Sequence, residues 1–350
     1  MKRKVLAGLG LLSLTLTTLG VNSPVSAQTA SVVMSGLDNP RGLAFGPGGA
    51  LYVAEAGRGG NGPSIVLQGQ DYSYGPTGAL TRLWRGKQMR VVTGLPSMAT
   101  ADGSATGPHD VSFQGQSGAY VTIGFGGDPA LRAGFGPAGA LFGTLIKVPK
   151  SGKWRVVSDI AAYEASVNPA GGPLDSNPYG LLARAGATIL TDAGGNTLLE
   201  VKPNGNISTL AVFPARPVRS TDSVPTAVAI GPDKAYYVSE LTGAPFTEGE
   251  ANVYRVVPGA APQIFRSGFK TIVDIAFGPD GSLYVLQYAT GPVFFSGPGQ
   301  VIRVMPDGTR EVIVSDLVQP TSLAISRNGT LYVTNNGTSI GSGEVLRIQP

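Results

Sequence analysis

The chain has 350 residues, of which 42% are hydrophobic and only 14% are charged, with 51 Gly, 27 Pro, one His and no Cys. The low charge content is unlike that of disordered or coiled-coil chains, and the absence of a Gly-X-Y period excludes collagen. The lack of Cys excludes disulfides, zinc–thiolate sites and thiol nucleophiles, and a single His excludes any mechanism that needs two. Many turns joining short apolar segments indicate β structure.

The first 27 residues have the pattern of a cleaved secretory signal. A basic start at residues 1–4 precedes an apolar run at residues 5–19, and Val25 and Ala27 place small residues at the −3 and −1 positions. The alternative, an uncleaved membrane anchor, needs about 20 strongly apolar residues, more than this run supplies. We therefore expect export to the periplasm or the extracellular space, without stable membrane insertion after cleavage.

Removal of the signal leaves a nearly neutral protein. Lys2, Arg3 and Lys4 depart with it, so the formal charge falls from +4 to +1. The rest of the sequence has no cluster of Lys and Arg with interleaved aromatic residues, which is the pattern expected of a nucleic-acid surface. We therefore expect no nucleic-acid partner.

An internal repeat organises the remainder of the chain. Each unit opens with a short apolar strand, continues through a tight turn such as Gly278-Pro-Asp-Gly281 into a second strand, and adds third and fourth strands. The six opening segments lie at residues 40–45, 108–113, 178–183, 225–230, 272–277 and 320–325. Four short strands per unit, repeated at spacings of 47 to 70 residues, are typical of a β-propeller.

The last unit lacks a fourth strand of its own. It ends at residues 344–348, and residues 30–37 near the mature N-terminus resemble the fourth strand at residues 311–317. The N-terminal segment can therefore complete the last unit and remove an exposed sheet edge. The sequence predicts an all-β, six-bladed β-propeller closed by an N-terminal strand, forming a single monomeric domain over residues 28–350.

The predicted connections between strands differ in length between the two faces of the propeller. The turns after the first and third strands of each blade are short, whereas long connections gather on the other face, which we call the loop-rich face. These connections are residues 56–77, 96–107, 124–142 and 161–177, with moderate ones at residues 241–250 and 288–298. Long loops on one face of a rigid scaffold carry function more often than they reflect drift, which is the alternative.

The repeat also predicts which polar side chains meet at the central channel. Arg41, His109 and Tyr179 follow the opening residue of their blades, and Asp110 and Asp274 occupy the next position. We predict Arg41, Asp110, Tyr179 and Asp274 as ligand contacts at the channel mouth. His109 is a candidate general base, and the alternative is a rim residue that bonds to Asp110 or to the backbone.

A second set of polar residues lies at the ends of the second strands. Glu55, Asp192, Glu240 and Asn335 are predicted to point toward the same opening. Carboxylate and amide oxygens are the ligands that Ca²⁺ takes in proteins, so these four residues are candidate metal ligands. The alternative is that they make turn hydrogen bonds around a solvated rim.

Aromatic residues are concentrated in the two longest insertions. Tyr72 and Phe125, with Tyr74, Phe135 and Phe142, can form an apolar platform for a ligand. The alternative is that these rings hold the insertions against the scaffold.

Several segments resemble those of ScyD/ScyE family proteins. The resemblance is carried by residues 39–57, by Gly-Pro-His-Asp-Val-Ser-Phe at 107–113, by Asp-Ser-Asn-Pro-Tyr-Gly-Leu at 175–181 and by Thr-Asp-Ala-Gly-Gly-Asn at 191–196, and it covers essentially the whole mature chain. It implies an exported six-bladed propeller similar to NHL and gluconolactonase-like proteins. It also implies an association with biosynthesis of scytonemin, an indolic-phenolic sunscreen of cyanobacteria.

The resemblance also bears on a metal. Gluconolactonase-like relatives hold a Ca²⁺ at the channel mouth with acids and amides, and Glu55, Asp192 and Asn335 match such roles loosely.

Three functions fit these observations. The first is a binding or accessory propeller that takes a small, aromatic ligand or a protein partner on the loop-rich face. The second is a metal-dependent hydrolase or lyase that uses the acidic mouth, with His109 as base, and the third is a protein-interaction scaffold. The sequence favours the first.

Overall fold

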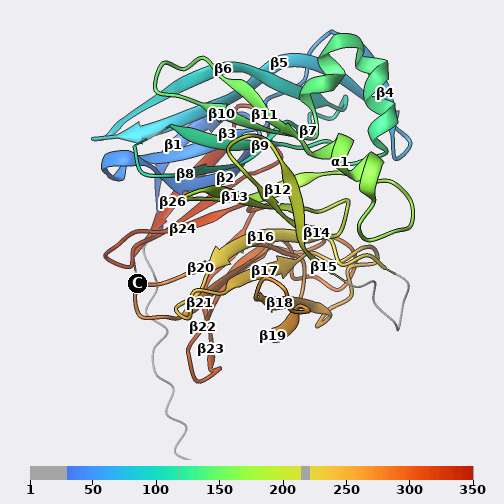
Figure 1. Cartoon of the computed structure of the whole chain (residues 1–350). Coiled ribbons are helices and arrows are strands. Elements are labelled where there is room, and N and C mark those ends of the chain that lie inside the picture. Colours follow the sequence, from blue (N-terminus) through green and yellow to red (C-terminus); the bar gives the residue numbers. More distant parts are fainter. Residues whose placement is uncertain (1–29, 117, 214–220, 350) are drawn as a thin grey trace, which may run out of the picture.

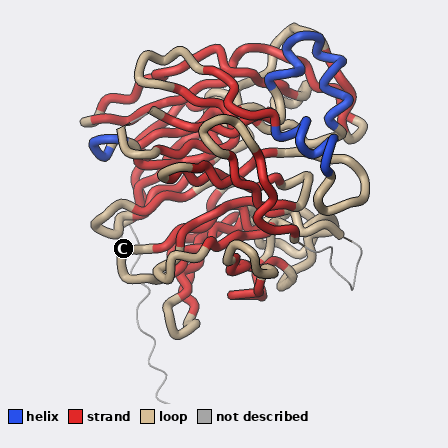
Figure 2. The backbone as a smooth tube through the Cα atoms, in the orientation of Figure 1, coloured by secondary structure: helices blue, strands red, loops and turns tan. Residues whose placement is uncertain are grey.

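The computed structural model describes residues 30–116, 118–213 and 221–349, so the predicted signal at residues 1–27 lies outside the described residues. Apart from short helices, the regular structure of the described chain is strand, and the strands form six separate antiparallel sheets (Figure 1, Figure 2). The first strand of each sheet contacts the first strands of the sheets before and after it, and the last contacts the first. The predicted six-bladed propeller is therefore confirmed.

In blades 1 to 5 the strands run in chain order from the channel outward, and in blade 6 the N-terminal strand is outermost. Blade 1 contains β2 (Pro40–Phe45), β3 (Leu51–Glu55), β5 (Gln70–Trp84) and β6 (Lys87–Ala99), with β4 (Ser64–Leu67) on β5 and β7 (Ala105–Thr106) on β6. Blade 2 contains β8 (Pro108–Phe113), β9 (Ala119–Ile123), β10 (Thr144–Val148) and β11 (Arg155–Asp159). Blade 3 contains β12 (Pro178–Arg184), β13 (Ala187–Asp192), β14 (Thr197–Val201) and β15 (Ile207–Val212).

The second half of the ring repeats this plan. Blade 4 contains β16 (Pro225–Ile230), β17 (Tyr236–Glu240), β18 (Ala251–Val256) and β19 (Gln263–Phe269). Blade 5 contains β20 (Ile272–Phe277), β21 (Leu283–Gln287), β22 (Gly299–Val304) and β23 (Arg310–Leu317). Blade 6 contains β24 (Leu323–Ile325), β25 (Leu331–Asn335), β26 (Gly343–Ile348) and β1 (Ala30–Leu37).

The second strands form the most deeply buried layer. Every residue of β9, β17 and β21 is buried, because each strand is covered on both faces by the neighbouring blades. The outer strands are largely exposed, as β23 shows, with Leu317 as its one buried residue. β-branched residues at the centre of the second strands, such as Val238, Val285 and Val333, suit a sheet buried on both faces.

The blade 6 opening strand is shorter than predicted. We expected it to begin at residue 320, but β24 begins at Leu323. The backbone N–H groups of Thr321 and Ser322 donate to the Thr334 hydroxyl, at 3.1 and 2.7 Å, instead of entering the ladder. A side-chain hydroxyl therefore replaces the first strand hydrogen bonds.

The ring is closed by the N-terminal strand, as predicted. β1 pairs antiparallel with β26, with Ala30 opposite Ile348 and Leu37 opposite Gly343. Met34 and Leu37 of β1 are each only 1% exposed and belong to the hydrophobic cluster between blades 6 and 1. The first and last described segments of the chain therefore stabilise one blade together.

The long connections of the loop-rich face are structured. Residues 56–77 contain β4 and the first part of β5, and residues 124–142 contain the 3-10 helix η2 (Pro129–Leu141). Residues 161–177 begin in the helix α1 (Ile160–Val167), whose first turn is capped by the Asp159 carboxylate. Within the described residues, no helix is long and apolar enough to cross a membrane.

Truncation of a buried side chain in the closing strand tests the closure. Met34→Ala should lower the free energy of unfolding by about 2–5 kcal/mol, because it leaves a cavity between blades 6 and 1. Val32→Ala in the same strand, at a site that is 53% exposed, should change it little. Urea unfolding of both variants measures the difference, and equal effects would show that β1 contributes little to closure.

Candidate functional site

The opening strands of all six blades line a narrow central channel. The cavity there measures about 10 Å³, which leaves room for about one water molecule. Its lining comes from two equivalent positions of the repeat: Gly42, His109, Asp110, Tyr179, Gly180, Thr226, Ala227, Val273, Asp274, Thr321 and Ser322. The structure thus brings together the residues that the repeat aligned, but an organic ligand can contact only the mouth of this channel.

Threonine hydroxyls join neighbouring blades around the channel. Thr122 donates to the carbonyl of Tyr179 at 2.7 Å, and Thr191 donates to that of Thr226 at 2.6 Å. Thr226 in turn donates to the carbonyl of Ile272 at 2.9 Å, and Thr321 donates to that of Pro40 at 2.7 Å. These bonds satisfy carbonyl groups of the innermost strands, which have no further strand to pair with.

Asp110 and Asp274 make the same connection in blades 2 and 5. The Asp110 carboxylate accepts from the N–H of Val111 at 2.7 Å and from that of Leu181, in the next blade, at 2.7 Å. The Asp274 carboxylate accepts from the N–H of Leu323 and from the Ser322 hydroxyl, at 2.8 and 2.5 Å. Both predicted ligand contacts therefore join blades.

These buried acids hold protons more tightly than ordinary carboxyl groups. Burial raises the pKa of Asp274 to about 6. Burial, reinforced by the charge of Asp274, raises the pKa of Asp110 well above its usual value, although backbone N–H groups oppose the shift. The channel therefore carries less negative charge near neutral pH than its two acids suggest.

His109 lies in the same layer and is only 6% exposed. Its Nδ1 is 3.2 Å from the carbonyl oxygen of Pro178, so Nδ1 carries the proton and donates to blade 3. Burial, followed by the charge of Arg41, lowers the pKa of His109 to about 3. A group with so low a pKa is a weak base at neutral pH, so this geometry favours a role in joining blades, and the catalytic role stays a prediction.

Arg41 marks the mouth of the channel. Its guanidinium donates to the carbonyls of Gly337 and Ala105, both at 2.7 Å, and these are its hydrogen bonds within the described residues. Burial raises the pKa of Tyr179 to about 12 and also raises that of Tyr288, and in both cases the charge of Arg41 opposes the shift. The charge of Arg41 therefore lies close enough to act on both phenols.

Glu55, a predicted metal ligand, is fully buried in an ion pair. Its carboxylate accepts from Nε and Nη2 of Arg90, at 3.0 and 2.6 Å, from the N–H of Asp38 at 2.7 Å, and from the Thr81 hydroxyl. Both carboxylate oxygens of Glu55 therefore accept hydrogen bonds from blade 1 and from the segment that enters it.

The other three predicted ligands are also engaged in their own blades. The Asp192 carboxylate accepts from the Ser176 hydroxyl and the Asn177 N–H, and the Glu240 carboxylate accepts from Ser223 and Asn252. The Asn335 side chain accepts from the N–H of Val318 at 2.7 Å. Among the described residues, no three His, Cys, Asp or Glu side chains are grouped as metal ligands, so these four do not fit one Ca²⁺ site.

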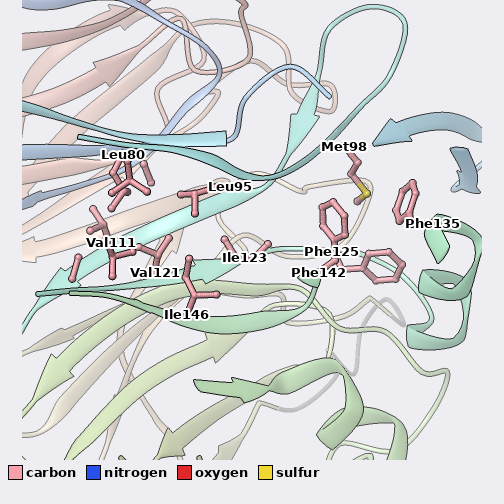
Figure 3. Close-up of a cluster of buried hydrophobic side chains, with 14 of the residues drawn as sticks. Leu80, Leu95, Met98, Val111, Val121, Ile123, Phe125, Phe135, Phe142 and Ile146 are labelled. Atoms are coloured by element: carbon pink, nitrogen blue, oxygen red, sulfur yellow. The ribbon is translucent and has the colours of Figure 1, made fainter. Parts of the chain in front are cut away.

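The aromatic residues of the long insertions form part of the core. Phe125, Phe135 and Phe142 are buried side by side (Figure 3), and Tyr72 packs against the same cluster. The geometry therefore agrees with the alternative in which these rings hold the insertions to blades 1 and 2. Phe125 offers almost no surface to a ligand.

A different set of aromatic residues is exposed on the loop-rich face. Phe294 is 55% and Phe295 46% exposed, and Phe246 stacks on Phe295 with ring centroids 4.1 Å apart. The Tyr288 ring contacts Phe295 edge-on at 5.2 Å, which links these phenylalanines to the mouth. We call Phe246, Phe294 and Phe295 the aromatic platform. The sequence analysis missed it, although all three lie in the moderate loops 241–250 and 288–298.

A group of acids near α1 was also missed. Burial, followed by the charges of Asp192 and Asp175, raises the pKa of Glu164 to about 7, and burial raises those of Asp175 and Asp192 to about 6. Glu164 is only 3% exposed. No spacing in the sequence indicates this group, because Glu164 reaches it from a helix and Asp192 from a strand.

Comparisons with known proteins agree with the fold. The chain is similar to a streptogramin B lyase, with 13% identity and a TM-score of 0.52, and the match covers 92% of this chain and 98% of the lyase. It is also similar to a glucose dehydrogenase, with 14% identity and a TM-score of 0.55, and the match covers 92% of this chain and 99% of the dehydrogenase. A third similar protein is regucalcin, a calcium-binding protein of Agrobacterium tumefaciens, with 13% identity and a TM-score of 0.53; the match covers 92% of this chain and 93% of regucalcin. No protein-family model and no curated protein matches the sequence. At these identities the likeness establishes the propeller fold alone.

His109→Gln should make the protein less sensitive to acid. The pKa of His109 is lowered in the folded state, so its contribution to stability is present above about pH 6.5 and is lost as the pH falls toward 3. Because His109 is the single His, a difference in urea unfolding between variant and wild type over this range reports on it alone. An identical acid profile would show that His109 is not buried in neutral form.

Glu164→Gln should have the opposite pH dependence. The raised pKa of Glu164 means that its contribution is present below its ordinary pKa of 4.5 and is lost as the pH rises through about 7. The variant should therefore melt higher than wild type at about pH 8 and similarly at about pH 4. Glu248→Gln, at an exposed loop position, is the matched control. A melting temperature raised equally at both pH values would contradict the burial of a charge here.

Proposed function

We propose that the protein is an exported binding or accessory propeller of the ScyD/ScyE type that takes a small aromatic ligand on its loop-rich face, in secondary metabolism such as scytonemin-type biosynthesis. The observation that carries this proposal is the exposed aromatic platform, which continues through Tyr288 to Arg41 at the channel mouth.

The platform has the features of a binding surface. Large exposed rings in contact with one another offer flat apolar area to a second ring, and aromatic pairs gain more than their buried area alone provides. Phe246 and Phe294 both have positive φ, at 57° and 44°. This backbone conformation is rare for bulky side chains, and such strain is found most often at functional sites.

Arg41 adds a site for an anionic group. A guanidinium has five N–H donors, and the hydrogen bonds described for Arg41 go to two carbonyls. An aromatic carboxylate or phenolate that lies on the platform can direct its charge toward the remaining donors. The phenols of Tyr179 and Tyr288, whose raised pKa values keep them protonated, can donate to the same group.

No comparable observation favours the hydrolase or lyase. The four predicted metal ligands are engaged in separate blades, and His109 lies in a channel that holds about one water molecule. A protein-interaction scaffold would use the same exposed platform, so the binding experiment also separates these two functions.

Titration of the purified protein with indole-3-carboxylate tests the proposal by calorimetry. Phe295→Ala should weaken binding by about tenfold, because stacking on one ring is worth about 1–3 kcal/mol, and Arg41→Gln should weaken it at least as much. Ile264→Ala, which removes an exposed side chain from the outer strand of blade 4, should leave the affinity unchanged.

Absence of binding to this acid would contradict an aromatic-acid ligand and favour the scaffold. Binding that survives both Phe295→Ala and Arg41→Gln would show that the ligand lies elsewhere.

A further inference from the structure

A second candidate site lies between blades 1 and 2, away from the channel mouth. A pocket of about 380 Å³ opens there, and its size falls in the usual range for small-molecule sites. Pro47, Gly118 and Lys150, from the turns after the first and third strands, form its rim. These are the short turns, so the pocket belongs to the face opposite the loop-rich one.

The walls of the pocket are two rows of cross-strand neighbours. Across blade 1, Tyr52 of β3 pairs with Arg82 of β5. Across blade 2, Phe113 of β8 pairs with Ala119 of β9, which pairs with Val148 of β10. Leu80, Val91 and Val92 complete a mostly apolar lining.

The pair of Tyr52 and Arg82 belongs to the repeat, and in other blades the arginine is neutralised. Arg255 pairs across the strands with Tyr237 in blade 4 and bonds to Asp233 at 2.6 Å. Arg303 pairs with Tyr284 in blade 5 and bonds to Asp280 at 2.5 Å. Both aspartates come from the Gly-Pro-Asp turn that joins the first two strands.

Blade 1 lacks this counter-charge. Its turn reads Gly46-Pro-Gly-Gly49, so Gly48 stands where the other two turns carry Asp. Arg82 has no ion pair among the described residues, and its buried Nε has no hydrogen-bond partner. Arg347 of blade 6, whose turn carries Asn328 in place of Asp, likewise has a buried Nε without a partner, but it does not line this pocket. The identity of one turn residue therefore decides whether the arginine of a blade is neutralised.

The equivalent space between blades 2 and 3 is closed. It measures about 10 Å³, and its lining includes Tyr120, which holds the place of Tyr52 in the repeat. The cation beside this tyrosine is Lys147, and its ammonium already contacts the ring: it donates to the Tyr120 hydroxyl at 3.2 Å and lies 5.0 Å from the ring centroid. The open pocket beside an unpaired cation is therefore not repeated at the junction of blades 2 and 3.

We propose that the pocket between blades 1 and 2 binds an amphipathic anion, a small molecule with a short apolar body and a single carboxylate-like head. The apolar body lies between Leu80, Val92 and Val148. The head bonds to Arg82, with Lys150 as a second cation at the rim. No Asp or Glu lines the pocket, so nothing within it opposes an anion. A buried donor without a partner is costly, and a ligand oxygen at Arg82 would relieve that cost.

Calorimetric titration with octanoate and with octylammonium, which share the same chain and differ in charge, tests the proposal. Octanoate should bind and octylammonium should not. Arg82→Met, which keeps the length of the side chain and removes its charge, should weaken octanoate binding by at least about tenfold. Arg347→Met removes the equivalent arginine of blade 6, whose buried Nε also lacks a partner, without touching the pocket, and should leave the affinity unchanged.

A second variant covers the case in which Arg82→Met disturbs the fold. Val91→Phe adds volume to a half-buried wall position, and should abolish octanoate binding without lowering the melting temperature. Failure of octanoate to bind, equal binding of the two probes, or binding that persists in Arg82→Met and Val91→Phe would each overturn the proposal.

Discussion

The hydrogen bonds that cross from blade to blade around the channel are the constraint on which the rest of the structure depends. Each innermost strand has a partner on one side only, so its remaining polar groups need side-chain partners from the next blade. The carbonyl groups accept hydrogen bonds from four threonine hydroxyls, those of Thr122, Thr191, Thr226 and Thr321. The N–H groups donate to the carboxylates of Asp110 and Asp274. These partners recur at three positions of the repeat: Thr122 and Thr191 near the ends of second strands, Thr226 and Thr321 just after the opening Pro of their blades, and Asp110 and Asp274 in first strands.

This arrangement moves any ligand away from the axis. The close approach that the bonds demand leaves a central cavity of about 10 Å³, and a Cβ added at Gly42 would lie 2.5 Å from the Cα of Asp110. The polar residues of the channel are therefore used for assembly, and their shifted pKa values follow from burial. Shifted pKa values are a common sign of catalysis, but structural networks produce them as well. The exposed aromatic platform lies on the loop-rich face, and a pocket of about 380 Å³ lies at the junction of blades 1 and 2.

The sequence was sufficient to predict the architecture because the repeat is periodic. The blade number, the strand order and the closing strand at residues 30–37 all follow from the spacing of similar segments, and the structure confirms them. The channel residues were also predictable, since equivalent positions in a ring converge on its axis. Their partners were not: whether Glu55 faces a metal or Arg90 depends on contacts between segments 35 residues apart. Likewise, the burial of Phe125 and the exposure of Phe295 depend on how each loop folds back, which composition does not encode.

A repeat also provides an internal reference for function. A residue that serves the fold recurs at the same position in several blades together with its partner. Arg255 with Asp233 and Arg303 with Asp280 are such pairs. A blade that keeps the arginine but loses the aspartate forgoes an ion pair, and exposed pairs of this kind are worth little to stability. The lost ion pair itself therefore costs the fold little, and the guanidinium is left without a counter-charge and with a buried Nε that has no partner. In blade 1 this guanidinium stands beside an apolar pocket of about 380 Å³, so the same change that the fold tolerates creates a surface with the chemistry to select an anion.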